Sequence, residues 1–286
     1  MLFPQMTIVG VGLIGGSLAK ACKQKGLVKK IIGINKEEKN VQKAKELGII
    51  DDYKLDIKEG VRESDIVVLA VPVSIINNLI EQIIPHLKNN CIVTDVGSTK
   101  RKIVALADRI IPRDLSFVGG HPIAGTENSG VEASLIDLFL DKKCILTPTP
   151  KTNLDALEKV KKLWTAVGSE VVLMDAAIHD RIFATVSHLP HIIAFCLVNS
   201  LGEMKKDLPD ILRYPGGGFK DFTRIASSDP KMWTDICLSN KEDILKSLDF
   251  FITRLNELRD FIKEEKLTDL MESFKTSQEI RKKIKP

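Results

Sequence analysis

Short apolar runs alternate with longer amphipathic stretches along the first 175 residues. The runs are rich in Val and Ile, as in the buried strands of a parallel sheet. They predict seven strands, at residues 6–9, 30–34, 66–70, 92–95, 116–118, 144–147 and 170–173. Between them, apolar residues recur at three- and four-residue spacing over residues 41–47, 75–84, 102–110 and 154–167, which is typical of crossover helices. The pattern predicts a doubly wound, Rossmann-type parallel sheet.

The pattern changes near residue 175. No strand-like alternation recurs beyond it, and helical periodicity dominates residues 176–201 and 241–265. A chain of 286 residues also reaches the size, about 250–300 residues, at which single cores stop growing. We therefore predict an α/β domain over residues 1–175 and an all-helical domain over residues 176–286.

Composition and charge narrow the class of protein. With 44% hydrophobic and 28% charged residues, the chain is expected to fold throughout. The 42 basic and 38 acidic residues are scattered, and a net charge of +4 is too mild to indicate a nucleic-acid partner. The longest apolar run, residues 66–73, falls short of the roughly 20 residues that span a bilayer, so we expect no membrane segment.

Cysteine usage and the N-terminus indicate a cytoplasmic protein. The five cysteines are widely spaced, odd in number and form no Cys-x-x-Cys pair, which favours reduced thiols. The apolar start has no preceding Lys or Arg and is interrupted by glycines, so we expect no targeting signal.

A glycine-rich motif follows the first predicted strand. It reads Gly10-Val11-Gly12-Leu13-Ile14-Gly15 and opens a helix, the context that a dinucleotide-binding motif requires. The three glycines permit, in order, a tight turn, the approach of the pyrophosphate and close packing of helix on strand. An unrelated glycine-rich turn is the alternative. The sequence predicts cofactor contacts from Gly10, Gly12, Leu13, Ile14 and Gly15.

The end of the second predicted strand bears on the choice of cofactor. Asn35 stands 20 residues after Gly15, where an acidic residue normally binds the adenine ribose 2′-hydroxyl. Asparagine can bind a hydroxyl, but it would not repel a 2′-phosphate, and Lys36 and Lys39 follow. We predict NAD as cofactor and leave NADP open; a solvated loop is the alternative for the two lysines.

Three further loops follow strands and should meet the glycine loop, because ligands bind beyond the carboxyl ends of the strands in open α/β sheets. They are Val71-Pro72, the stretch 95–100 with Ser98, and the stretch 119–127 with His121. Ser98 is a candidate substrate contact or simply a helix N-cap. His121 lies between a Gly-Gly pair and a proline, in what we predict is a rigid loop. It is a candidate general base for hydride transfer, with a structural turn histidine as the alternative.

The helical part carries further candidates. His188 and His191 share a helix face, but no acidic ligand or His-Glu-x-x-His pattern accompanies them, so we predict no metal site. Pro190 should kink that helix and free a carbonyl. After three glycines, Lys220 and Arg224 lie one turn apart, and a guanidinium suits a carboxylate; a solvated surface is the alternative.

Five strings in register, GVGLIGGS, DVGSTK, GGHPIAGTE, SHLPH and GGGFKDFTRIASSDPKMW, resemble the prephenate dehydrogenase family of tyrosine biosynthesis over nearly the whole chain. The resemblance implies oxidative decarboxylation of prephenate to 4-hydroxyphenylpyruvate with reduction of NAD. It implies that His121 accepts the hydroxyl proton, that Ser98 orients the hydroxyl and that Arg224 holds a carboxylate. His191, Lys220, Thr126 and Glu127 would shape the pocket.

The resemblance also implies a homodimer paired through the helical domain, with Trp233 near the neighbouring subunit. Asn35 is the clearest departure from the family pattern. Arogenate dehydrogenase is the nearest alternative. A β-hydroxyacid dehydrogenase would use a catalytic lysine, and a non-catalytic dinucleotide sensor would need no base.

Overall fold

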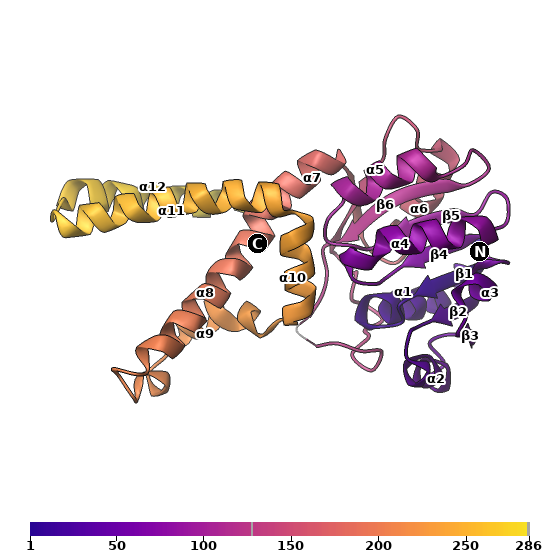
Figure 1. The fold of residues 1–286 in the computed structure, drawn as a ribbon, viewed down its shortest axis with the longest axis horizontal. Coiled ribbons are helices and arrows are strands. Elements are labelled where there is room, and N and C mark those ends of the chain that lie inside the picture. Colours follow the sequence, from indigo (N-terminus) through magenta and orange to yellow (C-terminus); the bar gives the residue numbers. More distant parts are fainter. Residues whose placement is uncertain (127, 285–286) are drawn as a thin grey trace. The chain divides into compact units, whose positions relative to one another are not determined.

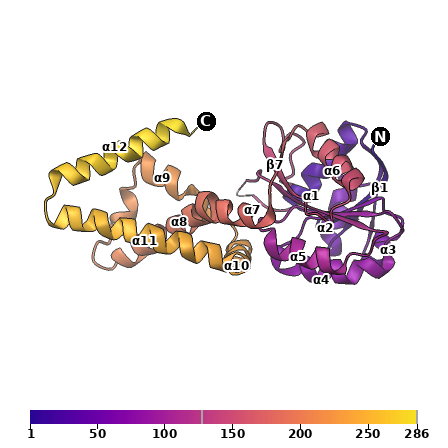
Figure 2. The same cartoon turned by 90° about the horizontal axis from the view of Figure 1, so that it is seen from above.

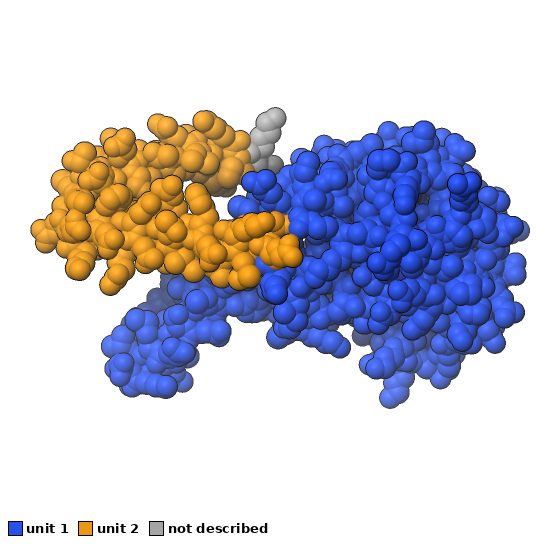
Figure 3. All heavy atoms as spheres, turned by 45° about the horizontal axis from the view of Figure 1, so that its top comes forward, with its two compact units in different colours: residues 1–241 blue, residues 242–286 orange. Residues whose placement is uncertain are grey.

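The computed structural model describes residues 1–126 and 128–284, so the predicted site residue Glu127 lies outside the described residues. The chain divides into two compact units, residues 1–241 and 242–286, which Figure 3 colours separately.

An eight-stranded sheet organises the first unit (Figure 1). Its order is β3-β2-β1-β4-β5-β6-β7-β8, and only the β6–β7 pair is antiparallel. From β1 the chain proceeds to one side of the sheet, and from β4 to the other, so the strand order reverses between these neighbours. The strands are β1 Phe3–Val9, β2 Val28–Ile34, β3 Asp52–Lys54, β4 Ile66–Leu69, β5 Ile92–Asp95, β6 Ser116–Pro122, β7 Lys143–Thr147 and β8 Glu170–Leu173.

Helices cover both faces of the sheet (Figure 2). On one face, α1 (Leu13–Gln24), α2 (Glu38–Glu46) and α6 (Leu154–Ala166) bury a core that includes Trp164 against the strands. On the other, α3 (Ile57–Val61), α4 (Val73–Ile83) and α5 (Arg101–Ile110) bury a second core of mostly aliphatic residues. Each amphipathic stretch thus places its apolar side on the sheet, and the predicted doubly wound fold is confirmed.

Two differences from the predicted elements have clear causes. The short strand β3 and helix α3 were missed because β3 lies at the sheet edge and carries no apolar run. The prediction that His121 lies in a loop was wrong, since β6 continues to Pro122. Antiparallel β7 supplies the partners for this extension, and His121 pairs with Ile145.

A continuous helix follows the sheet. It comprises α7 (Ala176–Phe183), a π-helical turn (Ala184–His188) and α8 (Leu189–Met204), and Asp175 caps its first turn. The π-helical turn lies directly before Pro190, where a backbone N–H is missing. The first unit then adds the 3-10 turns Ile211–Arg213 and Arg224–Ser227 and the helices α9 (Gly217–Thr223) and α10 (Pro230–Ser239).

This helix is long and apolar enough to cross a membrane by length and composition alone. It has 29 residues, its most apolar window has a mean hydropathy of 1.6, and 28% of that window is buried. The expectation of no such segment rested on uninterrupted runs, which the polar His179, Asp180 and His188 break. Helices that pack inside soluble proteins have the same composition.

The second unit consists of most of α11 (Lys241–Lys263) together with α12 (Leu267–Lys283). Several large apolar side chains on these helices are exposed, including Phe250, Leu255, Ile262 and Phe274. Such a surface on a monomer is typical of a protein interface.

Candidate active site

A cavity of about 860 Å³ opens at the carboxyl ends of β1, β4 and β5. This volume lies within the range of about 300–1,000 Å³ that is usual for small-molecule sites. Its lining comes from the glycine loop, the loops after β4 and β5, the end of β6 and the helical segment. Of the predicted site residues, it includes Gly12, Leu13, Ile14, Val71, Pro72, Ser98, His121, Thr126, His191 and Arg224.

The glycine loop has the geometry that a dinucleotide needs. Gly10 has a φ of +95°, and a Cβ there would lie 2.2 Å from the carbonyl oxygen of Ala70. A Cβ on Gly15 would lie 2.3 Å from the carbonyl oxygen of Gly10, so α1 packs tightly against its strand. Gly12 differs, because a Cβ there would meet nothing within 4 Å. Nothing in the chain fills the space at Gly12, where a pyrophosphate would approach the start of α1.

Asn35 follows β2 and lies outside this cavity. Its side-chain oxygen accepts a hydrogen bond from the main-chain N–H of Glu37 at 3.3 Å. The amide nitrogen therefore remains as a donor, and a donor accommodates a hydroxyl or a phosphate equally.

His121 belongs to a hydrogen-bonded chain of three side chains. Its Nδ1 lies 2.8 Å from Nε2 of His179, and Nδ1 of His179 lies 2.8 Å from Oδ1 of Asp180. Phe183 packs edge-on against the His121 ring, with the ring centroids 5.0 Å apart. Together these contacts hold the imidazole in one orientation.

The chain also determines which nitrogen of His121 carries a proton. A carboxylate only accepts hydrogen bonds, so Nδ1 of His179 donates to Asp180, and Nε2 of neutral His179 must then accept. Nδ1 of His121 is therefore the donor, which leaves the lone pair on Nε2. The arrangement presents a neutral imidazole ready to take a proton at Nε2.

Burial keeps both rings neutral. It lowers the pKa of His121 well below 6.5, and His179, Lys100 and His188 lower it further. Burial likewise lowers the pKa of His179, although Asp180 opposes the shift.

Asp180 remains a carboxylate in spite of its burial. Burial raises the pKa of its carboxyl, but hydrogen bonds from His179 and from the main-chain N–H groups of Lys100 and Arg101 outweigh this and leave the pKa lowered. Those N–H groups lie 2.7 and 3.0 Å from its oxygens. Asp180 therefore caps the start of α5, where Ser98 and Thr99 were considered as N-caps; the N-cap position is Lys100.

The helical wall of the cavity carries a second aromatic group. The ring of His191 stacks on Trp233 with centroids 3.8 Å apart, and its Nδ1 donates to the carbonyl oxygen of Ser187 at 2.8 Å. Burial lowers the pKa of His191, and Arg224 contributes in the same direction. Buried His188 accepts from the side chain of Asn240 at 3.2 Å, and burial lowers its pKa to about 4.

Some predicted residues lie apart from the cavity. Lys220 is exposed on α9 and does not line it. No group of His, Cys, Asp and Glu suited to a metal ion occurs among the described residues. Sequence reasoning missed His179 and Asp180. The only signal available was an adjacent His-Asp pair in a helix whose other residues are mostly apolar.

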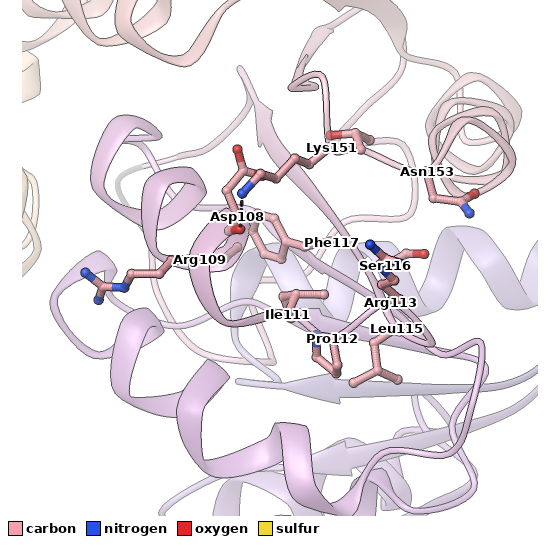
Figure 4. Close-up of a pocket in the computed structure, with 12 residues that line it drawn as sticks. Asp108, Arg109, Ile111, Pro112, Arg113, Leu115, Ser116, Phe117, Lys151 and Asn153 are labelled. Atoms are coloured by element: carbon pink, nitrogen blue, oxygen red, sulfur yellow. Dashed lines mark hydrogen bonds between the residues drawn. The ribbon is translucent and has the colours of Figure 1, made fainter.

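A second cavity, of about 590 Å³, lies by the end of α5, the start of β6 and the loop before α6 (Figure 4). Lys151 donates there to the main-chain oxygen of Asp108 at 3.1 Å. None of the predicted site residues lines this cavity, so the candidate chemistry belongs to the larger one.

A Rossmann-type sheet with an open glycine loop and a neutral histidine base in one cavity defines a nicotinamide-dependent dehydrogenase. Residues 18–173 match the family model for the prephenate dehydrogenase nucleotide-binding domain, and residues 175–276 match that for the prephenate dehydrogenase dimerization domain. The chain belongs to the prephenate dehydrogenase family.

Individual relatives agree with this assignment. The chain is 39% identical to prephenate dehydrogenase of Bacillus subtilis over 96% of this chain and 74% of that one. It is 38% identical to cyclohexadienyl dehydrogenase of Zymomonas mobilis over 99% and 97% of the two chains. Among solved structures, prephenate dehydrogenase from A. aeolicus in complex with hydroxyphenyl propionate and NAD+ shares 43% identity, with a TM-score of 0.92 and coverage of 99% and 98%.

Proposed function

We propose that this protein catalyses the oxidative decarboxylation of prephenate to 4-hydroxyphenylpyruvate with reduction of NAD. The observation that carries the proposal is the position of His121, whose oriented, neutral imidazole lines the same cavity as the glycine loop. The family to which the chain belongs supports the choice of reaction.

The proposed role of His121 is to move one proton. Its Nε2 accepts the proton of the ring hydroxyl while a hydride leaves the carbon that bears this hydroxyl. The bound nicotinamide supplies the acceptor for that hydride. Loss of carbon dioxide leaves its bonding electron pair in the ring, which becomes aromatic, and the resulting phenolate takes the proton back from His121. Positive charge on His121 during this cycle is shared through His179 with Asp180.

Arg224 and the loop residues Ser98 and Thr126 are the proposed substrate contacts. All three line the cavity around His121. The guanidinium suits a carboxylate of the substrate, and the Ser98 hydroxyl suits the reacting hydroxyl. Ring stacking on Trp233 fixes His191 against the opposite wall. Lys220 and Glu127 remain expected contributors to the pocket by resemblance.

The residues present fit a dinucleotide. Gly12 leaves space at the start of α1, and Val71 and Pro72 line the cavity beside it. Asn35, at the end of β2, is the proposed contact to the adenine ribose.

We infer that the protein forms a homodimer through its helical part. The family model that matches residues 175–276 is that of a dimerization domain. On the long helix, Ile178, Ile182 and Val186 recur every four residues and are 55%, 39% and 63% exposed. An apolar stripe of this kind needs a partner. All five cysteines are free, as expected in the reducing cytoplasm where we place the protein.

One assay tests the proposed function. Purified protein is given prephenate or arogenate, each with NAD or NADP, while the absorbance of reduced nicotinamide is followed and the aromatic product is identified. We expect turnover of prephenate with NAD. Arogenate differs only in carrying an amino group in place of the side-chain keto group, and a higher kcat/KM for arogenate would replace the proposed substrate.

The matched control for catalysis is a pair of histidine variants. His121→Asn should lose activity, whereas His86→Asn, on the 3-10 turn after α4 (Ile84–His86), should not. Absence of turnover with both substrates in the folded wild-type protein would refute the function.

A further inference from the structure

One fully buried ion pair lies beneath the site and has no part in the proton chain described above. Lys100 and Asp95 pair through Nζ and Oδ2, and both side chains have 0% exposure. Asp95 ends β5 and Lys100 directly precedes α5, so the pair closes the loop that carries Ser98.

Stability alone gives little reason to keep such a pair. Removing two charges from water costs several kcal/mol each, and well-packed apolar residues of similar volume often serve stability equally well or better. The pair is therefore better explained by what it holds in place.

The pair reaches His121 by two routes. Oδ1 of Asp95 accepts the N–H of Gly120 at 3.2 Å, which fixes the main chain directly before His121. The N–H of Lys100 donates to Asp180 at 2.7 Å, and Asp180 orients His179 and, through it, the ring of His121. Space is tight, since a Cβ on Gly120 would lie 2.8 Å from the carbonyl oxygen of Asp95.

We propose that Lys100 is a positioning residue of the reaction, whose ion pair with Asp95 fixes the main chain at His121 and whose fixed positive charge keeps His121 ready to accept a proton. The inference rests on the proposed role of His121 as the base. Lys100 itself touches no substrate in this account.

The charge argument includes every titratable group around the base. His179 and Asp180 face it from α7, His188 from the π-helical turn, and Lys100 and Asp95 from the ends of the loop after β5. Of these, only Lys100 carries a permanent positive charge. Lys100 lowers the pKa of both His121 and His179, whereas Asp95 opposes it only at His179.

The test uses Lys100→Met, which keeps the length of the side chain and removes its charge, and the double variant Asp95→Asn/Lys100→Met, which leaves no unpaired carboxylate. Lys88→Met is the matched control, because Lys88 also pairs with an aspartate, Asp65, at 2.8 Å but contacts no part of the site. For each variant we would measure the thermal midpoint, kcat, KM for prephenate and the pH profile of kcat/KM.

We expect Lys100→Met to lower kcat at least tenfold and to move the acid limb of the kcat/KM profile up by roughly one pH unit. In the double variant the thermal midpoint should recover, but the acid limb should stay displaced. Lys88→Met should leave kcat and the acid limb at wild-type values.

Two outcomes would overturn the inference. If both Lys100 variants lower only the thermal midpoint and leave the acid limb in place, the pair is merely structural. If the double variant restores both kcat and the limb, an unpaired Asp95 caused the defect and Lys100 has no positioning role. Failure of the proposed function is distinguishable, because the wild-type protein would then not turn over prephenate at all.

Discussion

Replacing His179 isolates the contribution of the proton chain from that of the base itself. In His179→Leu, His121 remains but its Nδ1–H loses the acceptor at 2.8 Å. When His121 takes the hydroxyl proton it becomes a cation, so the lost contact is a charge-assisted hydrogen bond worth about 1.5–3 kcal/mol. Since 1.4 kcal/mol is a factor of ten, kcat should fall by roughly ten- to a hundredfold.

The ground state should be affected much less. Neutral His121 binds substrate weakly, if at all, through this nitrogen, so KM for prephenate should change by less than about threefold. His179→Gln places an amide oxygen near the position of Nε2 and should recover part of kcat. Steady-state kinetics of the two variants and of His86→Asn, at a pH above the acid limb, provide the comparison.

A specific result would refute this reasoning. If His179→Leu keeps wild-type kcat, the His121–His179 contact has no role in the transition state. If His179→Gln is as slow as His179→Leu, the effect of His179 comes from packing against Phe183 rather than from the hydrogen bond.

The remaining predictions concern the base, the substrate, the cofactor and the assembly. His121→Asn should lower kcat by roughly 10²–10⁴, and wild-type kcat/KM should fall only as the pH drops through the lowered pKa of His121, a limb that the variant's residual activity should lack; near-normal kcat would exclude His121 as the base. Arg224→Ala should raise KM for prephenate by roughly ten- to a hundredfold without changing KM for NAD, and an unchanged KM for prephenate would exclude a carboxylate contact. Wild-type protein should prefer NAD only modestly, and Asn35→Asp should increase the NAD/NADP ratio of kcat/KM, because a carboxylate repels a 2′-phosphate; strong rejection of NADP by both proteins would contradict this. Light scattering at micromolar concentration should give the mass of a dimer, and a monomer mass would refute the inferred interface.

The sequence was most informative where the determining signal is local. Val- and Ile-rich runs identified seven strands, and Gly10, Gly12 and Gly15 identified the cofactor loop, because a turn and a close approach depend on a few adjacent residues. β3 escaped detection because an edge strand of three residues buries too little to impose a pattern.

The proton chain could not be found in this way. Its links join β6 to α7 across 58 residues, and the apolar spacing of α7 would be the same without His179. Likewise, the strand extension that carries His121 depends on β7, a neighbour supplied 21 residues later by a chain running in the opposite direction. Tertiary pairing, rather than local propensity, determined both features.

The dual use of Asp180 has a consequence for the order in which the molecule becomes competent. The glycine loop and the strand that bears His121 are both complete by Pro122, whereas the groups that orient the imidazole lie on α7, beyond the last strand of the sheet. During synthesis, the nucleotide-binding surface therefore exists before the base has a defined direction. Catalytic competence begins when the carboxylate of Asp180 docks on the first amides of α5 and, in the same event, aligns His179 with His121.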